Sequence, residues 1–226
     1  AGHYSYFGVP DITALPLQDY PFIIVASLIC GLLGGLFSFF LVEGSRAVGP
    51  LVLKQPLVVA MVIGLLLAVM GLLSDGATMG SGYVEAKALL AMEAEGSWWT
   101  AFGRVIATMI TYFSGIPGGI FSPSLAAGAE FGASMSSLFP SVPPVSLILV
   151  GMASYFAGVV QRPITAFVIV LELTGNNHDI LPVLMVSALA ATVVSKLVMP
   201  EPVYHVLAKD LVRSWEHLLK EKRNDS

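Results

Sequence analysis

The chain has 226 residues, of which 56% are hydrophobic and only 12% are charged, and its mean hydropathy is +0.82. A soluble domain carries roughly twice that share of charge, so the composition indicates a protein whose solvent is the bilayer. The formal net charge of -4 and the absence of a basic stretch with interleaved aromatic residues exclude a nucleic-acid surface. The single cysteine, Cys30, excludes an internal disulfide, and the four histidines lack zinc-ligand spacing, so we expect no metal and no cofactor.

The first apolar runs are long enough to cross a membrane, which takes about 20 residues. We predict spans over 21–42 and 56–74, both free of charged residues. A polar stretch with a short helix over 84–92 follows them. It ends at Trp98 and Trp99, a pair suited to the membrane–water interface.

A glycine- and proline-rich segment, 115–123, interrupts the charge-free region between Arg104 and Glu130. We predict one helix from after Arg104 to about Ser114 and another from about Pro123 to Leu138. Hydrocarbon offers no water to backbone groups freed by such a break, so the break has to be buried in protein or line a wet cavity. The first amides of the second helix point back into the break, and a helix N-terminus with free N–H groups favours an anion.

The segments after the break are apolar and of unequal length, with predicted helices over 145–160, 164–173, 180–198 and from about Val203 onward. Several of the roughly nine helical segments are too short to span alone, as is typical of transporters and channels rather than receptors. We therefore predict an all-α polytopic membrane protein with broken and tilted helices. It forms one membrane domain over 1–226 without a separate soluble domain.

The segment 114–132, SGIPGGIFSPSLAAGAEFG, resembles the G-x-F-x-P filter segment of the CLC family of chloride channels and chloride/proton antiporters. Four later segments, 161–166, 169–176, 180–182 and 202–204, look like later parts of that family in the same order. The resemblance covers essentially the whole chain, but only the second of the family's two inverted repeats plus its final helix. Because neither a methionine nor a signal peptide opens the chain, we expect the first repeat to lie upstream.

The resemblance implies a chloride site made by the backbone amides of Gly119, Ile120 and Phe121 and by the hydroxyl of Tyr204. The side chains of Phe121 and Pro123 would fix the turn rather than bind. Fixed N–H dipoles suit chloride, which is large and weakly hydrated, because they replace its water without a full positive charge. The competing interpretation is that the break is only a tight turn between packed helices, with Tyr204 an interface anchor.

Two departures from the family pattern limit what the resemblance implies. The family's gating glutamate lies in a G-[KR]-E-G-P motif that the chain lacks, and its serine motif G-S-G-x-P is matched only in part by 80–84. We therefore leave Ser81 out of the anion site. Two acids in apolar segments, Glu130 and Glu172, are interpreted as structural, hydrogen-bonded groups rather than proton carriers. The sequence separates neither a voltage-gated type of channel from an antiporter, nor chloride from fluoride, nitrate or bromide.

The resemblance further implies a homodimer in which each subunit keeps its own pore. The contact is expected along 164–173 and 180–194, with Ile180 and Leu184 exposed on it. We expect a multi-pass protein of the cell (inner or plasma) membrane whose C-terminus is cytoplasmic. The basic residues predicted to face the cytoplasm are Arg46, Lys54, Arg162, Lys209, Arg213, Lys220, Lys222 and Arg223.

Two other classes of function stay open beside anion transport. An intramembrane serine hydrolase would use Ser81 as nucleophile and His178 or His205 as base. Against it, Ser81 follows Asp75 in a polar stretch expected at the membrane surface, where small glycine–serine runs are usually turns. A non-transporting scaffold made from half a transporter is the third class. We expect a transport protein and no enzyme.

Overall fold

The computed structural model describes residues 6–10, 12, 15–116, 118–175 and 178–212, and every regular element in these ranges is helical. The numbered helices are α1 (Tyr20–Lys54), α2 (Pro56–Leu73), α3 (Tyr83–Leu90), α4 (Trp98–Phe113), α5 (Phe121–Met135), α6 (Pro144–Val160), α7 (Pro163–Leu173) and α8 (Leu181–Val198). Short 3-10 turns, Leu17–Asp19 and His178–Ile180, precede α1 and α8, and residues 203–212 form a final helical segment. The all-α prediction is confirmed.

Proline marks the start of several helices, because its missing N–H is one that the first turn would leave unpaired in any case. Pro56, Pro144 and Pro163 open α2, α6 and α7, close to the predicted starts. Other boundaries differ from the prediction. The first helix runs on to Lys54, since a charged residue ends a charge-free run without ending a helix. For the same reason α4 does not start after Arg104: it begins at Trp98, and Arg104 is buried within it.

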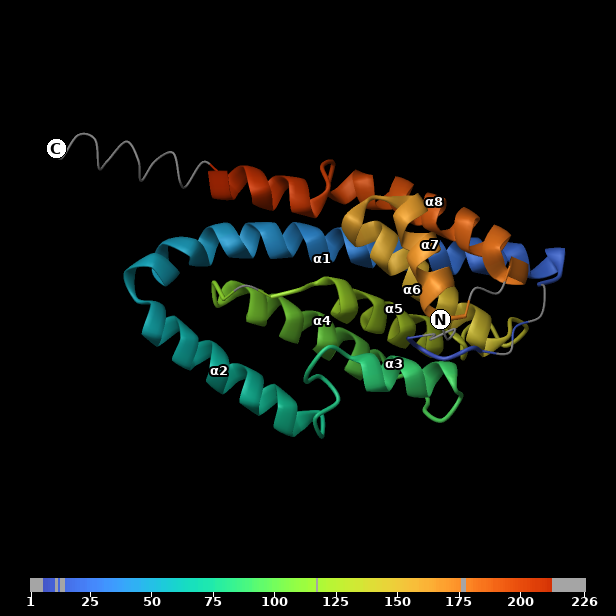
Figure 1. Cartoon of the computed structure of the whole chain (residues 1–226), viewed down its shortest axis with the longest axis horizontal. Helices are drawn as coiled ribbons and strands as arrows, with labels where there is room; N and C mark the ends of the chain where they lie inside the picture. Colours follow the sequence, from blue (N-terminus) through green and yellow to red (C-terminus); the bar gives the residue numbers. More distant parts are fainter. Residues whose placement is uncertain (1–5, 11, 13–14, 117, 176–177, 213–226) are drawn as a thin grey trace, which may run out of the picture.

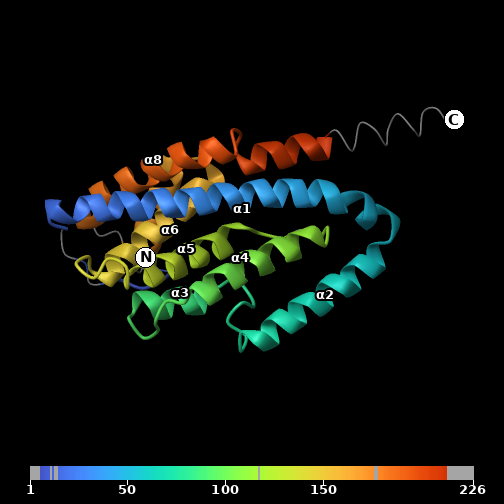
Figure 2. The same cartoon turned by 180° about the vertical axis from the view of Figure 1, so that it is seen from behind.

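Three segments are long and apolar enough to cross a membrane: Leu17–Lys54, Pro56–Leu73 and His178–Val198. They contain the predicted spans 21–42 and 180–198 and match the predicted span 56–74 to within one residue. Helices α6 and α7 are apolar but shorter. Figures 1 and 2 show α1 and α8 running side by side, while α2 is inclined to α1 and projects from the rest of the bundle. The prediction of unequal and tilted helices is confirmed as well.

Helix α6 lies at the centre of the protein and is buried from Ser146 to Val160. It packs on α5, α1 and α8, while only 11% of α2 is buried. Lipid tails are as apolar as leucine, so helices in a membrane associate largely through close backbone packing. The glycine residues of α6 therefore determine how closely the neighbouring helices approach it.

Glycines bring the α6 backbone into contact with two neighbours. Gly151 faces Gly128 and Gly132 of α5, and Gly158 faces Gly31 of α1. A Cβ atom placed on Gly151 would overlap the Gly128 carbonyl oxygen and the Gly132 backbone, neither of which can turn aside as a flexible side chain does. The packing of α5 on α6 therefore depends on the absence of a side chain here.

The expectation that Ile180 and Leu184 are exposed is wrong. Their exposed fractions are 1% and 0%. Helix α8 turns one face toward α1 and α6, and a continuous apolar run does not reveal which of its residues lie on that face. The large apolar residues that α8 leaves exposed are Met185, Val186, Leu189, Val193 and Leu197.

Gly151→Ala tests the close packing of α6. We expect the variant to lose about 1–3 kcal/mol of stability, because the added methyl group overpacks a backbone contact. Gly64→Ala in α2 is the matched control, since a Cβ there meets no atom within 4 Å. Thermal unfolding in detergent should show a lower midpoint for Gly151→Ala only. Equal midpoints for the two variants would contradict this account of the core.

Candidate functional site

The break between α4 and α5 has a defined geometry on its α4 side. Gly115 has a φ of +71°, in the left-handed region that favours glycine, and this ends the helix. Ser114 stabilises this end of α4. Its hydroxyl donates to the Thr111 carbonyl oxygen at 2.7 Å and accepts the Ile116 N–H at 3.2 Å. The predicted turn is therefore an ordered helix end, although Pro117 itself lies outside the described residues.

Helix α5 begins at Phe121, earlier than the predicted Pro123, with Ile120 as its N-cap and no side chain capping it. Four N–H groups at a helix start lack partners within the helix. Among the described residues, no group accepts a hydrogen bond from the N–H of Gly119, Ile120 or Phe121. These three amides are the ones that the sequence predicts as anion donors.

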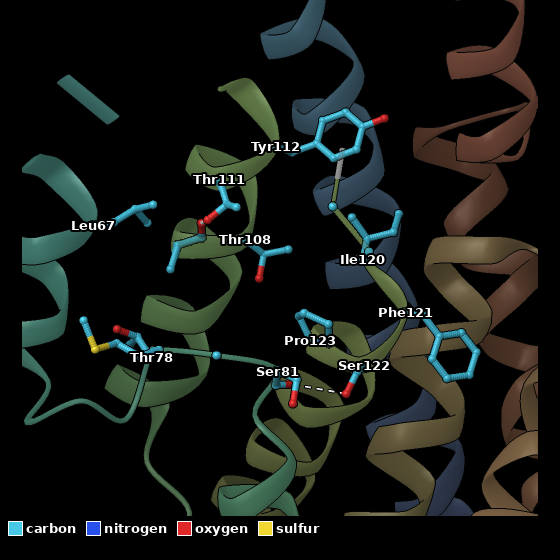
Figure 3. A pocket seen from close by; sticks show the side chains of 15 residues that line it. Leu67, Thr78, Ser81, Thr108, Thr111, Tyr112, Ile120, Phe121, Ser122 and Pro123 are labelled. Atoms are coloured by element: carbon cyan, nitrogen blue, oxygen red, sulfur yellow. Dashed lines mark hydrogen bonds between the residues drawn. The ribbon is translucent and has the colours of Figure 1, made fainter. Parts of the chain in front are cut away.

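A cavity of about 700 Å³ lies in front of these amides (Figure 3). Residues 118–123 form one side and the α2–α3 loop, 78–81, forms another, while Thr108, Thr111 and Tyr112 of α4 line the wall between them. None of the described lining residues carries a charge. The break therefore lines a cavity, as its position in an apolar region requires.

Several side-chain hydroxyls around this cavity already have partners within the protein. Thr108 and Thr111 each donate to a carbonyl one turn earlier in α4, both at 2.7 Å. Ser122 donates to the Ser81 carbonyl oxygen at 3.2 Å, the contact drawn in Figure 3. With these protons used within the protein, the donors left to meet a ligand are the backbone amides of the turn and the hydroxyls of Ser81 and Tyr112.

The three residues of the turn differ in the direction of their side chains. Ile120 is buried in the core. The Phe121 ring packs edge-to-face on Phe156 of α6, with ring centroids 4.8 Å apart, and points away from the cavity in Figure 3. A Cβ on Gly119 would meet no atom within 4 Å. Two side chains thus anchor the turn while its backbone stays open.

Tyr204 does not line this cavity. It stands at the start of the helical segment 203–212 and is 50% exposed. Leu207 and Ala208, one turn further along, line a second cavity of about 800 Å³ against α1 and the end of α4. Tyr112 lines both cavities, and its phenol lies within electrostatic range of the Tyr204 phenol. The structure therefore places Gly119, Ile120 and Phe121 at the first cavity. Tyr204 lies outside it, one turn before residues that line the second cavity.

Sequence reasoning missed Tyr112 and the cavity wall made by the α2–α3 loop. Gly76, Gly80 and Gly82 of this loop all have a positive φ, and their recurrence in GATMGSG was an available signal for a tightly shaped loop. Tyr112 carried a weaker signal, its place just before the break. Ser81, which the sequence predicts at the membrane surface, also lines the cavity.

The structure corrects the interpretation of one buried acid. Glu172 is exposed, because α7 buries Ala166 and Val170 on its opposite side, whereas Glu130 is only 4% exposed. The hydrolase alternative gains no support. His205 Nε2 lies 3.6 Å from Glu201, which stands just before the helical segment 203–212, and neither His205 nor His178 is among the described residues that line the cavity with Ser81.

The fold is that of a polytopic helical membrane protein with discontinuous helices, the class that contains channels and transporters. A family model described as "Voltage gated chloride channel" matches residues 1–196. The chain belongs to the voltage-gated chloride channel (CLC) family, and the resemblance noted from its motifs is confirmed.

Relatives and solved structures agree with this assignment. The chain is 42% identical over 111 residues to an H(+)/Cl(-) exchange transporter ClcA of Vibrio campbellii, a match covering 46% of this chain and 24% of that protein. It is 35% identical over 165 residues to ClcA of Yersinia pestis, covering 66% and 34%.

Two solved structures share the fold. A slow cyanobacterial Cl-/H+ antiporter matches with a TM-score of 0.76 and 26% identity over 94% of this chain and 51% of that one. A CLC-type fluoride/proton antiporter matches with a TM-score of 0.77 and 24% identity over 88% and 49%. The chain thus spans about half the length of these structures.

Proposed function

We propose that this protein transports small inorganic anions, chloride foremost, across a cell membrane through a CLC-type pore. The observation that carries the proposal is the set of three amides, Gly119, Ile120 and Phe121, which lack acceptors among the described residues and open on an uncharged cavity. Amide dipoles at a helix start attract an anion, and the absence of a cationic lining residue allows its release.

Chloride/proton exchange is the form of transport that the names of the relatives favour, since they are called exchange transporters or antiporters. The chain corresponds to one membrane domain, the second inverted repeat and the final helix. We propose that a first repeat upstream supplies the gate and the proton-carrying groups. A channel remains the second form, and the ratio of protons to chloride moved by the complete protein distinguishes the two.

Tyr204 is proposed as a further donor to the same anion. It stands one turn before Leu207 and Ala208, which line the second cavity, and Tyr112 lines that cavity as well as the one in front of the turn. We propose that the anion passes between the two cavities and so comes near both phenols. A phenol donates one hydrogen bond and stays neutral, so it adds affinity without trapping the anion.

We further propose a multi-pass arrangement with the C-terminus in the cytoplasm. Arg46 of α1 and Asp210 of the final helix form an ion pair, with Nε and Oδ2 2.7 Å apart, so the basic end of α1 lies beside the last helix. The remaining basic tail residues, Arg213, Lys220, Lys222 and Arg223, lie outside the described residues.

Gly119→Pro tests the amide site. Proline removes one of the three donors and restricts the backbone of the turn, so chloride flux from liposomes containing the full-length protein should fall at least about tenfold. Gly119→Ala is the matched control, because it keeps the N–H and its Cβ has free space. Normal flux in Gly119→Pro would mean that the break is only a turn.

Tyr204→Phe tests the phenolic donor. The variant loses one hydrogen bond and keeps the three amides, so chloride affinity should weaken by about 1 kcal/mol, or roughly fivefold to tenfold. Isothermal titration of the purified full-length protein with chloride measures the change. An unchanged affinity would remove Tyr204 from the site and leave the amide proposal standing.

A homodimer is proposed through the apolar face that α8 leaves exposed. Tryptophan at both Leu189 and Val193, which are 52% and 65% exposed, should disrupt an isologous contact and yield monomers. Val84→Trp on α3 is the control, at a residue 69% exposed and away from that face. Light scattering in detergent measures the mass. If the double variant keeps the mass of the unmodified protein, α8 does not form the dimer contact.

A further inference from the structure

Arg104 is a buried charge inside the bundle, with 1% of its surface exposed. Burying a cation among apolar helices costs free energy unless the cation is paired. A buried arginine is therefore a candidate functional residue. Its Nη2 atom donates to the Ala77 carbonyl oxygen at 2.5 Å and lies 3.5 Å from a Glu85 carboxylate oxygen. Both partners belong to the chain just after α2, so Arg104 joins α4 to the α2–α3 loop and to α3.

The loop is shaped around this guanidinium. Gly82 has a φ of +75°, and a Cβ there would lie 2.5 Å from Nη1 of Arg104. Nε and Nη1 have no hydrogen-bond partner among the described residues. Glu130 of α5, itself 4% exposed, also acts electrostatically on the Arg104 charge. The two residues that bound the charge-free stretch of the sequence thus lie within electrostatic range of each other in the fold.

The loop held by Arg104 is also a wall of the anion cavity. Residues 78–81 line the cavity opposite the turn, and Ser122 in the first turn of α5 donates to the Ser81 carbonyl oxygen at 3.2 Å. A continuous set of contacts therefore runs from Arg104 through the loop to the helix start that carries the amides. Figure 3 shows its last contact, between Ser81 and Ser122. Arg104 does not itself line the cavity.

We propose that Arg104 is a positioning residue for anion selection: it holds the α2–α3 loop at a fixed distance from the turn and so sets which anions fit. The inference rests on the proposed anion site. Burial prevents Arg104 from touching the anion, and Glu85 and Glu130 offset its charge. The cavity can therefore be shaped by a cation without holding the anion too tightly for release.

The test uses Arg104→Lys, Ser122→Ala and the double variant in the full-length protein. Lysine keeps the charge but loses the planar guanidinium, whose Nη2 contacts both Ala77 and Glu85. Arg162→Lys is the matched control, because Arg162 is exposed at the start of α7. Titration gives chloride and nitrate affinities, and thermal unfolding without added anion reports any general loss of stability.

We expect Arg104→Lys to weaken chloride binding by about tenfold and to change the chloride-to-nitrate ratio, with an unfolding midpoint near that of the control. Ser122→Ala should weaken binding by about threefold. The double variant should bind no more weakly than Arg104→Lys alone, because both changes act through the loop.

The inference would be overturned if Arg104→Lys had the same chloride affinity and chloride-to-nitrate ratio as the Arg162→Lys control. It would also be overturned if the fold losses of affinity in the two single variants multiplied in the double variant. If Arg104→Lys does not insert, Ser122→Ala alone decides: a weakened affinity supports the inference, and an unchanged one overturns it. Gly119→Pro separates this outcome from failure of the anion site, since it tests the amides directly.

Discussion

The close approach of α6 to α5 and α1 is the contact on which the rest of the structure depends. Gly151 and Gly158 let the α6 backbone touch its neighbours, and this fixes α5 along its length. The free amides of Gly119 and Ile120, just before α5, and of Phe121, its first residue, are therefore attached to a helix whose position is fixed. Amides that need no reorganisation to meet an anion bind it with less loss of conformational freedom, which is what a transport site requires.

Several polar side chains around the proposed site already have partners within the protein. Hydroxyls of α4 donate within their own helix, Ser122 donates to the loop, and the buried Arg104 is turned toward Ala77 and Glu85. Fewer side-chain donors are thus left to compete with the backbone amides for an anion. The described residues that line the cavity carry no charge, which in the proposed transport role favours passage over permanent binding.

Much of the fold could be predicted from the sequence, because helix starts carry local signals such as Pro56, Pro144 and Pro163. The turn residues could also be predicted, since glycine and proline within a charge-free run break a helix. Burial was not. Uniformly apolar helices have no polar face to show their orientation, which is why Leu184 was expected outside and Glu172 inside. The place of Arg104, Tyr112 and Tyr204 depends on contacts between distant segments, which no local pattern records.

Helix lengths carry a consequence for how the protein is made. Helices α5 and α7 have 15 and 11 residues, too few to be retained by lipid as independent spans, whereas α1, α2 and α8 are long enough to insert by themselves. The long helices therefore have to be in the bilayer before the short ones find a stable place. Since α8 follows α5 and α7 in the chain, the ribosome releases the short helices before their full scaffold exists. The anion turn at the head of α5 is thus a late product of biogenesis, completed only after most of the chain has been synthesised.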